Sequence, residues 1–409
     1  MTDMPQDGNV TLERIREAYG PLKAVARRTP LLTSRTLDVM AGGAVHLKAE
    51  NLQKTGSFKI RGAYTALSRL SAAEREKGVV TASAGNHAQG IALAAQLTGI
   101  RARVFMPLGA SIAKILATRG YGADVQLAGG SFDEAVAAAQ ELAQNTGAPF
   151  ISAFDHDDII TGQGSVGLEL LEDLPDVDTV LIPVGGGGLI SGMAIALKES
   201  RPSLRVIGVQ AEGCPAATDS WRAGSVVAAA QAKTIADGIA VKKPSPRTLH
   251  YLRKYVDDMV TVGDEEIATT IVTLMERMKI LVEGAGAVAL TALIARKAVP
   301  KGRTAVVLSG GNIDIKLLES LIERSMIRAG RYVRLFTAVD DRPGGLARLL
   351  KMIAEQQGNI IDVIHNRTST TVPIGMTGVE ILIETRDPAH IQALISAMKS
   401  AAYPVQLIP

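Results

Sequence analysis

Lys59 stands within NLQKTGSFKIRGA, residues 51–63, where it follows Phe58 directly and has mostly small neighbours. A lysine in such a stretch can be an ordinary surface residue, with its stem on apolar neighbours and its ammonium group in water. It can also be a nucleophile, if partial burial removes its proton and a carbonyl compound binds beside it. The surrounding motifs must decide between these two interpretations.

Four consecutive glycines, Gly185–Gly188, separate an apolar run from a helical pattern in LIPVGGGGLISG. Glycines at such a turn let backbone amides approach a ligand, and the start of the helix adds partial positive charge, so a phosphate fits there. A flexible hinge is the alternative. The stretch matches neither the nucleoside-triphosphate loop nor a clean dinucleotide fingerprint.

The stretch TASAGNHAQG, residues 81–90, joins a predicted strand to a predicted helix through small residues. Ser83, Asn86 and His87 lie beside amides that could receive a carboxylate or a phenolic oxygen. Helix capping by Ser83 or Asn86 is the alternative that needs no ligand. By itself, His87 is more typical of a packed structural histidine.

Two further motifs place single polar groups among small residues. Ser309 ends an apolar run in VLSGGN, where it is either a hydrogen-bonding group or part of a tight turn. Glu283 lies in LVEGAGAVAL, where burial would shift its pKa and exposure would make it a helix-terminal charge.

Taken together, these motifs describe one small ligand. It needs a carbonyl group for Lys59, a phosphate for the glycines and a ring whose oxygen and nitrogen meet Asn86 and Ser309. Pyridoxal 5'-phosphate has all of these groups, and we expect it as the cofactor.

The elements that must position these residues alternate between β-rich and helical runs from about residue 44 to 310. Examples are residues 78–99, 102–130 and 178–213. Strand, glycine-rich turn, helix and strand in repetition predict open parallel sheets covered by helices. Ligands in such folds bind beyond the carboxyl ends of the strands, where the glycine-rich turns fall.

The pattern changes after a helical run and a short basic linker that ends near Arg331. Residues 332–367 read as strand, Pro-Gly turn, helix and strand, and residues 378–409 as strand, helix and strand. A βαββαβ unit of this kind predicts a separate ferredoxin-like domain.

In this order, the motifs SFKIRGA, SAGNHAQG, GQGSVGLEL, PVGGGGLISG, EGAGA and SGGN resemble those of the fold-type II pyridoxal-phosphate enzymes. The resemblance is greatest to threonine ammonia-lyases with a C-terminal ACT domain, because DDRPGGLARLLKMIAEQQGNI resembles the first half of that domain. It implies a catalytic domain over residues 1–325, with a small subdomain at about 52–155 inserted in a larger one, and an ACT-like regulatory domain over residues 326–409.

The resemblance also implies a role for each site residue. Lys59 would be catalytic and bind the cofactor as an imine, Phe58 would flank its ring, Asn86 would bind its ring oxygen and Ser309 would face its ring nitrogen. The cofactor phosphate would lie on Gly185, Gly186, Gly187, Gly188 and Leu189. The substrate would contact Ser83, Ala84, Gly85, Asn86, His87 and Glu283.

The reaction implied is elimination and deamination of L-threonine, and of L-serine, to a 2-oxo acid and ammonia. Lys59 would remove the α-proton, and the cofactor phosphate would protonate the leaving hydroxyl. Related activities remain open: a serine or 3-hydroxyaspartate dehydratase, a serine racemase, or a catalytically silent amino-acid sensor. Similar racemases carry a serine at the position of Ala84, so we expect little racemisation here.

A divalent-metal site known from this family is incomplete in the sequence. Glu212 matches one ligand of that site, but Thr218 stands where an aspartate is expected. We therefore predict no metal.

The ACT-like tail implies control by an amino-acid effector at Gly344, Gly345 and Leu346, and pairing of subunits into a homodimer or homotetramer. A tail that only joins subunits and binds nothing is the alternative.

The composition of the chain reduces the classes of binding partner that we expect. The chain has 409 residues, 47% of them hydrophobic, with 44 basic and 41 acidic residues. This charge balance gives no reason to expect nucleic acid or an anionic membrane as a partner. The single cysteine excludes an internal disulfide, and the first 20 residues lack a signal-peptide pattern, so we expect a cytoplasmic protein with small-molecule partners.

Overall fold

The computed structural model describes residues 10–367 and 372–408. Contacts divide the chain into two compact units, Met1–Ile313 and Asp314–Pro409. Helix α14 (Ile315–Arg328) therefore groups with the second unit, whereas the family resemblance implied a catalytic domain that extends to residue 325. The two units are described separately below.

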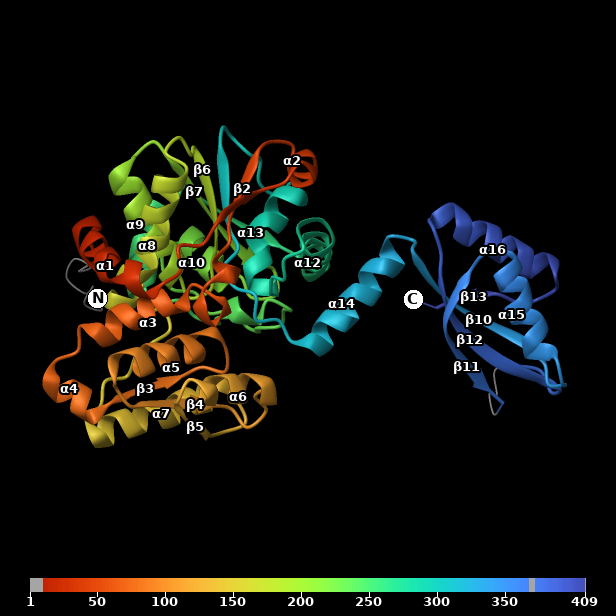
Figure 1. The fold of residues 1–409 in the computed structure, drawn as a ribbon, viewed down its shortest axis with the longest axis horizontal. Helices are drawn as coiled ribbons and strands as arrows, with labels where there is room; N and C mark the ends of the chain where they lie inside the picture. Colours follow the sequence, from red (N-terminus) through yellow and green to blue (C-terminus); the bar gives the residue numbers. More distant parts are fainter. Residues whose placement is uncertain (1–9, 368–371, 409) are drawn as a thin grey trace. The chain divides into compact units, whose positions relative to one another are not determined.

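A six-stranded sheet forms the centre of the first unit (Figure 1). Its strands, in spatial order, are β1 (Leu31–Thr33), β2 (Val45–Lys48), β9 (Thr304–Val307), β6 (Thr179–Pro183), β7 (Arg205–Ala211) and β8 (Asp258–Val262). All neighbours pair in parallel except β1 with β2. The parallel sheet predicted from the alternating pattern is confirmed.

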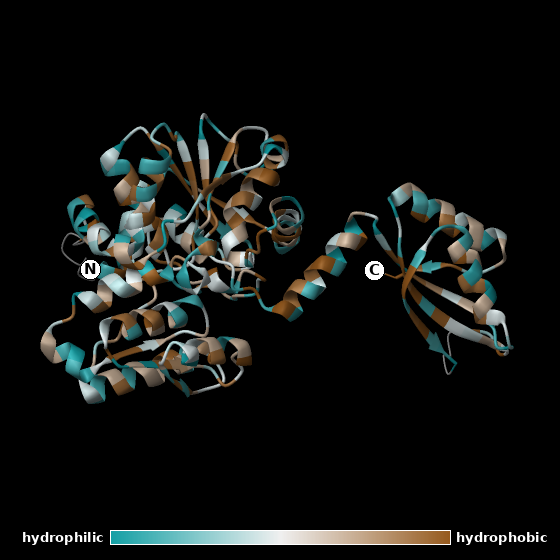
Figure 2. Cartoon of the chain, in the orientation of Figure 1, coloured by the Kyte–Doolittle hydropathy of each residue, from teal (hydrophilic) through white to brown (hydrophobic). Residues whose placement is uncertain are grey.

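The central strands of this sheet are buried along their whole length. Every residue of β6 and of β9 is buried, as expected for strands that helices cover on both faces. Among the helices around it, α8 (Asp157–Asp173), α9 (Gly188–Ser200) and α13 (Gly284–Ile294) are themselves buried over most of their length. Figure 2 shows the hydrophobic residues concentrated on the strands.

A smaller sheet lies in the same unit. It contains β3 (Val79–Ala82), β4 (Ala102–Met106) and β5 (Asp124–Leu127), all parallel. Apolar residues of α3 (Lys59–Ser68) and α5 (Asn86–Thr98) pack on one side, and alanines of α7 (Phe132–Thr146) pack on the other. Each face of the sheet thus has its own hydrophobic core.

The remaining helices of this unit are α1 (Leu12–Val25), α2 (Arg35–Ala41), α4 (Ala72–Lys77), α6 (Ile112–Gly120), α10 (Ala216–Ala223), α11 (Pro246–Tyr255) and α12 (Asp264–Met278), with short 3-10 turns η1 (Glu50–Leu52), η2 (Lys54–Gly56) and η3 (Asp237–Ile239). Among the described residues, no helix is long and apolar enough to cross a membrane.

The second unit has the predicted βαββαβ order. After α14 come β10 (Tyr332–Asp340), α15 (Gly345–Glu355), β11 (Asn359–Asn366), β12 (Met376–Glu384), α16 (Pro388–Ser400) and β13 (Gln406–Leu407). The strands form an antiparallel sheet in the order β11-β12-β10-β13, with α15 and α16 on one face (Figure 1). The core between them contains Leu349, Ile353, Leu394 and Met398. The ferredoxin-like prediction is confirmed.

Candidate functional site

Lys59 is the first residue of helix α3, and its side chain is partly buried. Its Nζ atom donates a hydrogen bond to the backbone oxygen of Ala153 at 3.1 Å and lies 5.0 Å from the centre of the Phe58 ring. Burial lowers the pKa of the Lys59 ammonium group to about 8, against the opposing charge of Glu283. This lysine therefore loses its proton more readily than a lysine in water.

A buried cluster of charges fixes the helix that carries Lys59. Arg61 has no exposed side-chain surface and pairs with Glu50 at 2.8 Å and with Glu169 at 2.7 Å. Lys48, also fully buried, lies 2.9 Å from the same Glu169 carboxylate. Because each of these charges has partners of opposite sign, the cluster holds α3 firmly against α8.

Glycines let α3 and α8 approach closely. A Cβ atom on Gly62 would lie 2.7 Å from the backbone oxygen of Ile159, and one on Gly162 would lie 2.5 Å from that of Arg61. Both distances are too short for any side chain. The glycines of SFKIRGA and GQGSVGLEL thus set the position of Lys59 through packing.

The loop before α5 contains the predicted substrate residues Ser83, Ala84 and Gly85, all partly exposed. Ser83 Oγ accepts a hydrogen bond from the Gly85 amide at 3.2 Å, which stabilises the turn. Helix α5 begins directly after it, at Asn86. A helix start beside small, partly exposed residues favours binding of a carboxylate.

Asn86 lies at the centre of a hydrogen-bond chain. Its Nδ2 donates to Glu283 Oε1 at 2.6 Å, and its Oδ1 accepts from Asn312 Nδ2 at 2.7 Å. Asn312 also donates to the backbone oxygen of Thr55 at 2.7 Å. Both ends of the Asn86 amide are thereby oriented, and one N–H of its NH2 group stays available for a ligand.

Glu283 precedes helix α13 and is 6% exposed. Burial, followed by the nearby charge of Asp237, raises the pKa of the Glu283 carboxyl to about 7, although Asn86 and the two lysines Lys59 and Lys114 oppose the shift. Of the two alternatives drawn from the sequence, the buried and perturbed carboxyl is the one found.

His87 is buried rather than open to solvent. Its Nε2 atom lies 3.1 Å from the backbone oxygen of Ile151, and burial lowers the pKa of its imidazole to about 3. The ring is therefore neutral at physiological pH. This placement is that of a packed structural histidine, and contact of His87 with a substrate stays a prediction.

The glycine loop follows strand β6 and leads into helix α9, which begins at Gly188. Gly187 has a φ of +95°, a conformation that other residues rarely adopt. A Cβ atom on Gly186 would lie 2.3 Å from the ring of Phe154. Leu189, the next residue along the helix, is buried. The loop thus needs glycine for both conformation and space.

Ser309 and its neighbours close the site from strand β9. Ser309 Oγ donates to the backbone oxygen of Ala285 at 3.3 Å. The Phe58 backbone amide donates to the backbone oxygen of Ser309 at 3.2 Å. A Cβ atom on Gly310 would lie 2.2 Å from Glu283 Oε1. The structure therefore brings Lys59, Phe58, Asn86, Glu283 and Ser309 together.

Three residues of the site escaped the sequence analysis. Asn312 lies within the SGGN motif but was given no role there, and Ala153 and Phe154 lie in a stretch without glycine. Their contacts join segments far apart in sequence, such as residues 59 and 153. A signal for Asn312 was present, because it follows the carboxyl end of a predicted parallel strand, the edge at which ligands bind in such folds. The other two had none.

The residues considered for a metal have other partners. Glu212 Oε1 lies 3.7 Å from Lys297 Nζ, and the Thr218 hydroxyl donates to Gln210 at 3.0 Å. Within residues 10–367 and 372–408, no three histidine, cysteine or acidic side chains are grouped as metal ligands.

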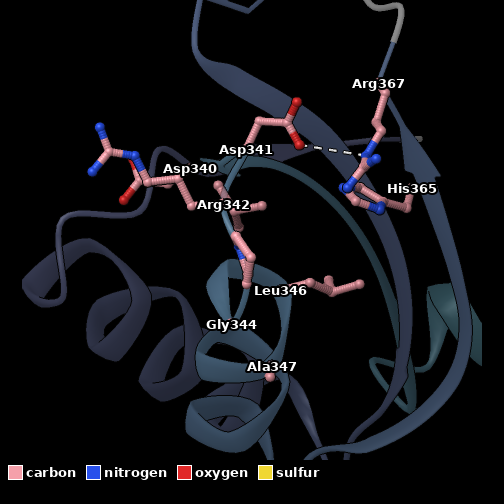
Figure 3. Close-up of a pocket in the computed structure, with 10 residues that line it drawn as sticks. Asp340, Asp341, Arg342, Gly344, Leu346, Ala347, His365 and Arg367 are labelled. Atoms are coloured by element: carbon pink, nitrogen blue, oxygen red, sulfur yellow. Dashed lines mark ion pairs between the residues drawn. The ribbon is translucent and has the colours of Figure 1, made fainter.

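Two of the three predicted regulatory residues, Gly344 and Leu346, line a pocket of about 300 Å³ in the second unit, and Gly345 lies between them in sequence (Figure 3). Gly344 has a φ of +87°, helix α15 begins at Gly345, and Leu346 points from the helix toward strand β11. Opposite them lie His365 and Arg367, and Arg367 pairs with Asp341 at 3.4 Å. The pocket therefore combines a helix start, charges of both signs and apolar surface.

Comparisons with known proteins show the family to which the chain belongs. The family model described as pyridoxal-phosphate dependent enzyme matches residues 22–310. The chain therefore belongs to this family, and its fold is that of the fold-type II members.

The chain is 48% identical to the L-threonine ammonia-lyase of Thermotoga maritima over 399 residues, which cover 98% of this chain and 100% of the relative. Among solved structures it resembles the processed form of threonine deaminase isoform 2 from Solanum lycopersicum, with a TM-score of 0.73 and 37% identity over 76% of this chain and 92% of that one. It also resembles maize serine racemase, with a TM-score of 0.73 and 34% identity over 78% of this chain and 98% of that one.

The residues present fit pyridoxal phosphate. The Lys59 amine has a lowered pKa, the Asn86 amide keeps an N–H for a ring oxygen, and the glycine loop leaves no room for side chains. Each group of the cofactor thus has a chemical counterpart in the site.

Proposed function

We propose that this chain is a threonine ammonia-lyase, which converts L-threonine to 2-oxobutanoate and ammonia and L-serine to pyruvate and ammonia. The observation that carries the proposal is the 48% identity to an L-threonine ammonia-lyase over 98% of this chain. The perturbed Lys59 amine at the site supports it independently.

Lys59, Phe58, Asn86, Gly185–Gly188 and Ser309 would hold the cofactor. When bound, pyridoxal phosphate supplies a carbonyl group for the substrate amine and a ring that withdraws electrons from the α-carbon. Ser309 carries no charge, so it would leave the ring nitrogen largely unprotonated. That limits delocalisation of the α-carbon charge and favours loss of the β-substituent over transamination.

The protein's own groups would do the remaining work. The start of α5 with Ser83, Ala84 and Gly85 would bind the substrate carboxylate. Lys59 Nζ would take the α-proton, which a neutral amine can do and an ammonium group cannot. The β-hydroxyl would then leave as water with one added proton, which balances the α-proton taken by Lys59, and give an enamine. The enamine would tautomerise to an imine, which water hydrolyses to the 2-oxo acid and ammonia.

Racemisation is the second candidate, because maize serine racemase has a similar fold. Inverting the α-carbon needs a second acid on the opposite face of the substrate. Ala84 has no such group, so elimination is favoured over racemisation.

The test is the rate of 2-oxo acid formation from L-threonine, L-serine and threo-3-hydroxyaspartate. Wild-type enzyme should turn over threonine fastest and give little D-serine. Lys59→Ala should abolish the reaction, whereas Lys54→Ala should not, because Lys54 is an exposed lysine five positions earlier. Fastest turnover of hydroxyaspartate would replace the proposed substrate, and absence of any product would favour an amino-acid sensor.

We also propose that an amino-acid effector binds the pocket of the second unit. The start of α15 and Arg367 could bind the carboxylate of the effector, and Asp341 could bind its ammonium group. Leu346 could contact an apolar side chain of the effector. A panel of L-amino acids should include one that raises the unfolding temperature and alters the rate. Leu346→Asp should remove both effects and leave the basal rate unchanged. If no amino acid acts, the unit has no effector of this class.

Pairing of two chains through strand β11 would make a homo-oligomer. This strand lies at an edge of its sheet and exposes Ile361 by 45% and Ile364 by 50%. Light scattering should show a dimer or larger assembly, and Ile364→Lys should reduce its mass. The buried, unpaired thiol of Cys214 fits a reducing compartment such as the cytoplasm.

A further inference from the structure

Phe154 lies in a turn that is anchored at both sides. The amide of Asp155 donates to Ser152 Oγ at 3.1 Å, and the Asp155 carboxylate pairs with Arg247 of helix α11 at 2.8 Å. Because the turn is held by a hydrogen bond and an ion pair, the Phe154 ring has a fixed starting point.

The turn contacts two parts of the site at once. The backbone oxygen of Ala153 accepts the hydrogen bond from Lys59 Nζ at 3.1 Å. One residue later, the Phe154 ring lies against Gly186, where a Cβ atom would be 2.3 Å from ring carbon Cγ. The Phe154 backbone also lies against Gly188, with 3.0 Å between Cα and the position of a Cβ atom. Phe154 thus borders the glycine loop, and the residue before it in sequence binds the reactive amine.

This position matters for the substrate's side chain. This inference rests on the function proposed above. In that reaction the substrate's α-carbon lies beside Lys59 Nζ, and its β-carbon is one bond further away. Phe58 already lies 5.0 Å from Nζ. Phe154 directly follows the residue that binds Nζ, and its ring lies against the glycine loop. On the proposed function, the β-substituent would therefore lie toward the Phe154 ring. An aromatic face favours contact with a methyl group and disfavours a carboxylate, because the face carries partial negative charge.

We propose that Phe154 determines specificity: it selects a methyl group on the β-carbon, so that threonine is preferred to serine and 3-hydroxyaspartate is rejected. A residue of this kind should change the ratio of two substrates more than the overall rate. One methyl group in an apolar site is typically worth about 10- to 200-fold in kcat/KM.

The test compares Phe154→Leu and Phe154→Ala with wild-type holoenzyme. The ratio of kcat/KM for threonine to that for serine should fall about tenfold or more in Phe154→Ala, and less in Phe154→Leu. Phe150→Leu is the matched control, because Phe150 packs on the core of the small sheet and should leave the ratio unchanged. Titration of cofactor absorbance should show that both Phe154 variants still bind pyridoxal phosphate.

The outcomes separate this inference from the function on which it rests. If threonine and serine lose kcat/KM in parallel, or cofactor affinity falls with them, Phe154 has only a structural role and the inference is wrong. If wild-type enzyme makes no 2-oxo acid from either amino acid, the proposed function itself fails.

Discussion

Replacing Glu283 by glutamine should make the first unit more stable at neutral and alkaline pH. The Glu283 carboxyl is buried, and its pKa rises from an ordinary value of 4.5 to about 7. Ionising it in the folded chain therefore costs about 3 kcal/mol more than in the unfolded chain. Glutamine removes this cost and can still accept the hydrogen bond from Asn86.

The sign of the pH dependence follows from the direction of the shift. Below pH 4.5 the carboxyl is protonated in both the folded and the unfolded chain, so it imposes no cost. Between pH 4.5 and 7 the folded chain binds more protons, and wild-type stability falls as pH rises. Above pH 7 the full cost is present. The advantage of Glu283→Gln should thus grow from nearly nothing at pH 4 to about 3 kcal/mol at pH 8.

Urea unfolding of the cofactor-free enzyme at a series of pH values measures this difference. The single tryptophan, Trp221, packs on the core of the first unit and reports its unfolding by fluorescence. Glu76→Gln is the control, because Glu76 is exposed and should show no such trend. A difference between wild type and Glu283→Gln that is the same at every pH would refute the reasoning, since a buried amide alone can only shift stability uniformly.

Three other variants test the frame of the site. Arg61→Ala leaves two buried carboxylates without their main cation and should lower stability by about 3–5 kcal/mol in urea unfolding. Asn312→Ala removes the donor that orients Asn86 and should weaken cofactor binding about fivefold, as measured by absorbance titration. Gly186→Ala places a methyl group against the ring of Phe154 and should prevent cofactor binding in the same titration.

For each of these three variants, one result would contradict the structural reason given for the prediction. Unchanged stability in Arg61→Ala would mean that the buried charges do not hold α3. Unchanged cofactor affinity in Asn312→Ala would mean that Asn86 is oriented without it. Normal binding by Gly186→Ala would mean that the glycine loop and the Phe154 ring can separate at little cost.

The sequence predicted the frame of the protein well. Glycine-rich turns after apolar runs indicated parallel strands and their ligand-binding ends, because glycine lets the backbone approach a ligand closely at the carboxyl end of a strand. Lys59, Asn86 and Ser309 lie on such turns, and the structure brings them together. The change of pattern after residue 331 likewise predicted the βαββαβ unit.

Contacts between distant segments could not be predicted from local pattern. Phe154 looks like any apolar residue in its stretch, and only the fold places its ring on Gly186. For Glu283 the sequence allowed both burial and exposure, because a helix start can face either side. The burial of His87 was open for the same reason, and its contact with the Ile151 backbone oxygen appears only in three dimensions.

The buried charge cluster around Arg61 also bears on when helix α3 can become buried while the chain is being synthesised. Arg61 is 11 residues from Glu50 but 108 residues from Glu169. A nascent chain that has not reached Glu169 offers Arg61 only one of its two carboxylates, and burying an incompletely paired charge is costly. We therefore expect helix α3 to take its buried position only after α8 has been made. The reactive lysine is among the first residues made, yet it takes its place only after a further hundred have followed.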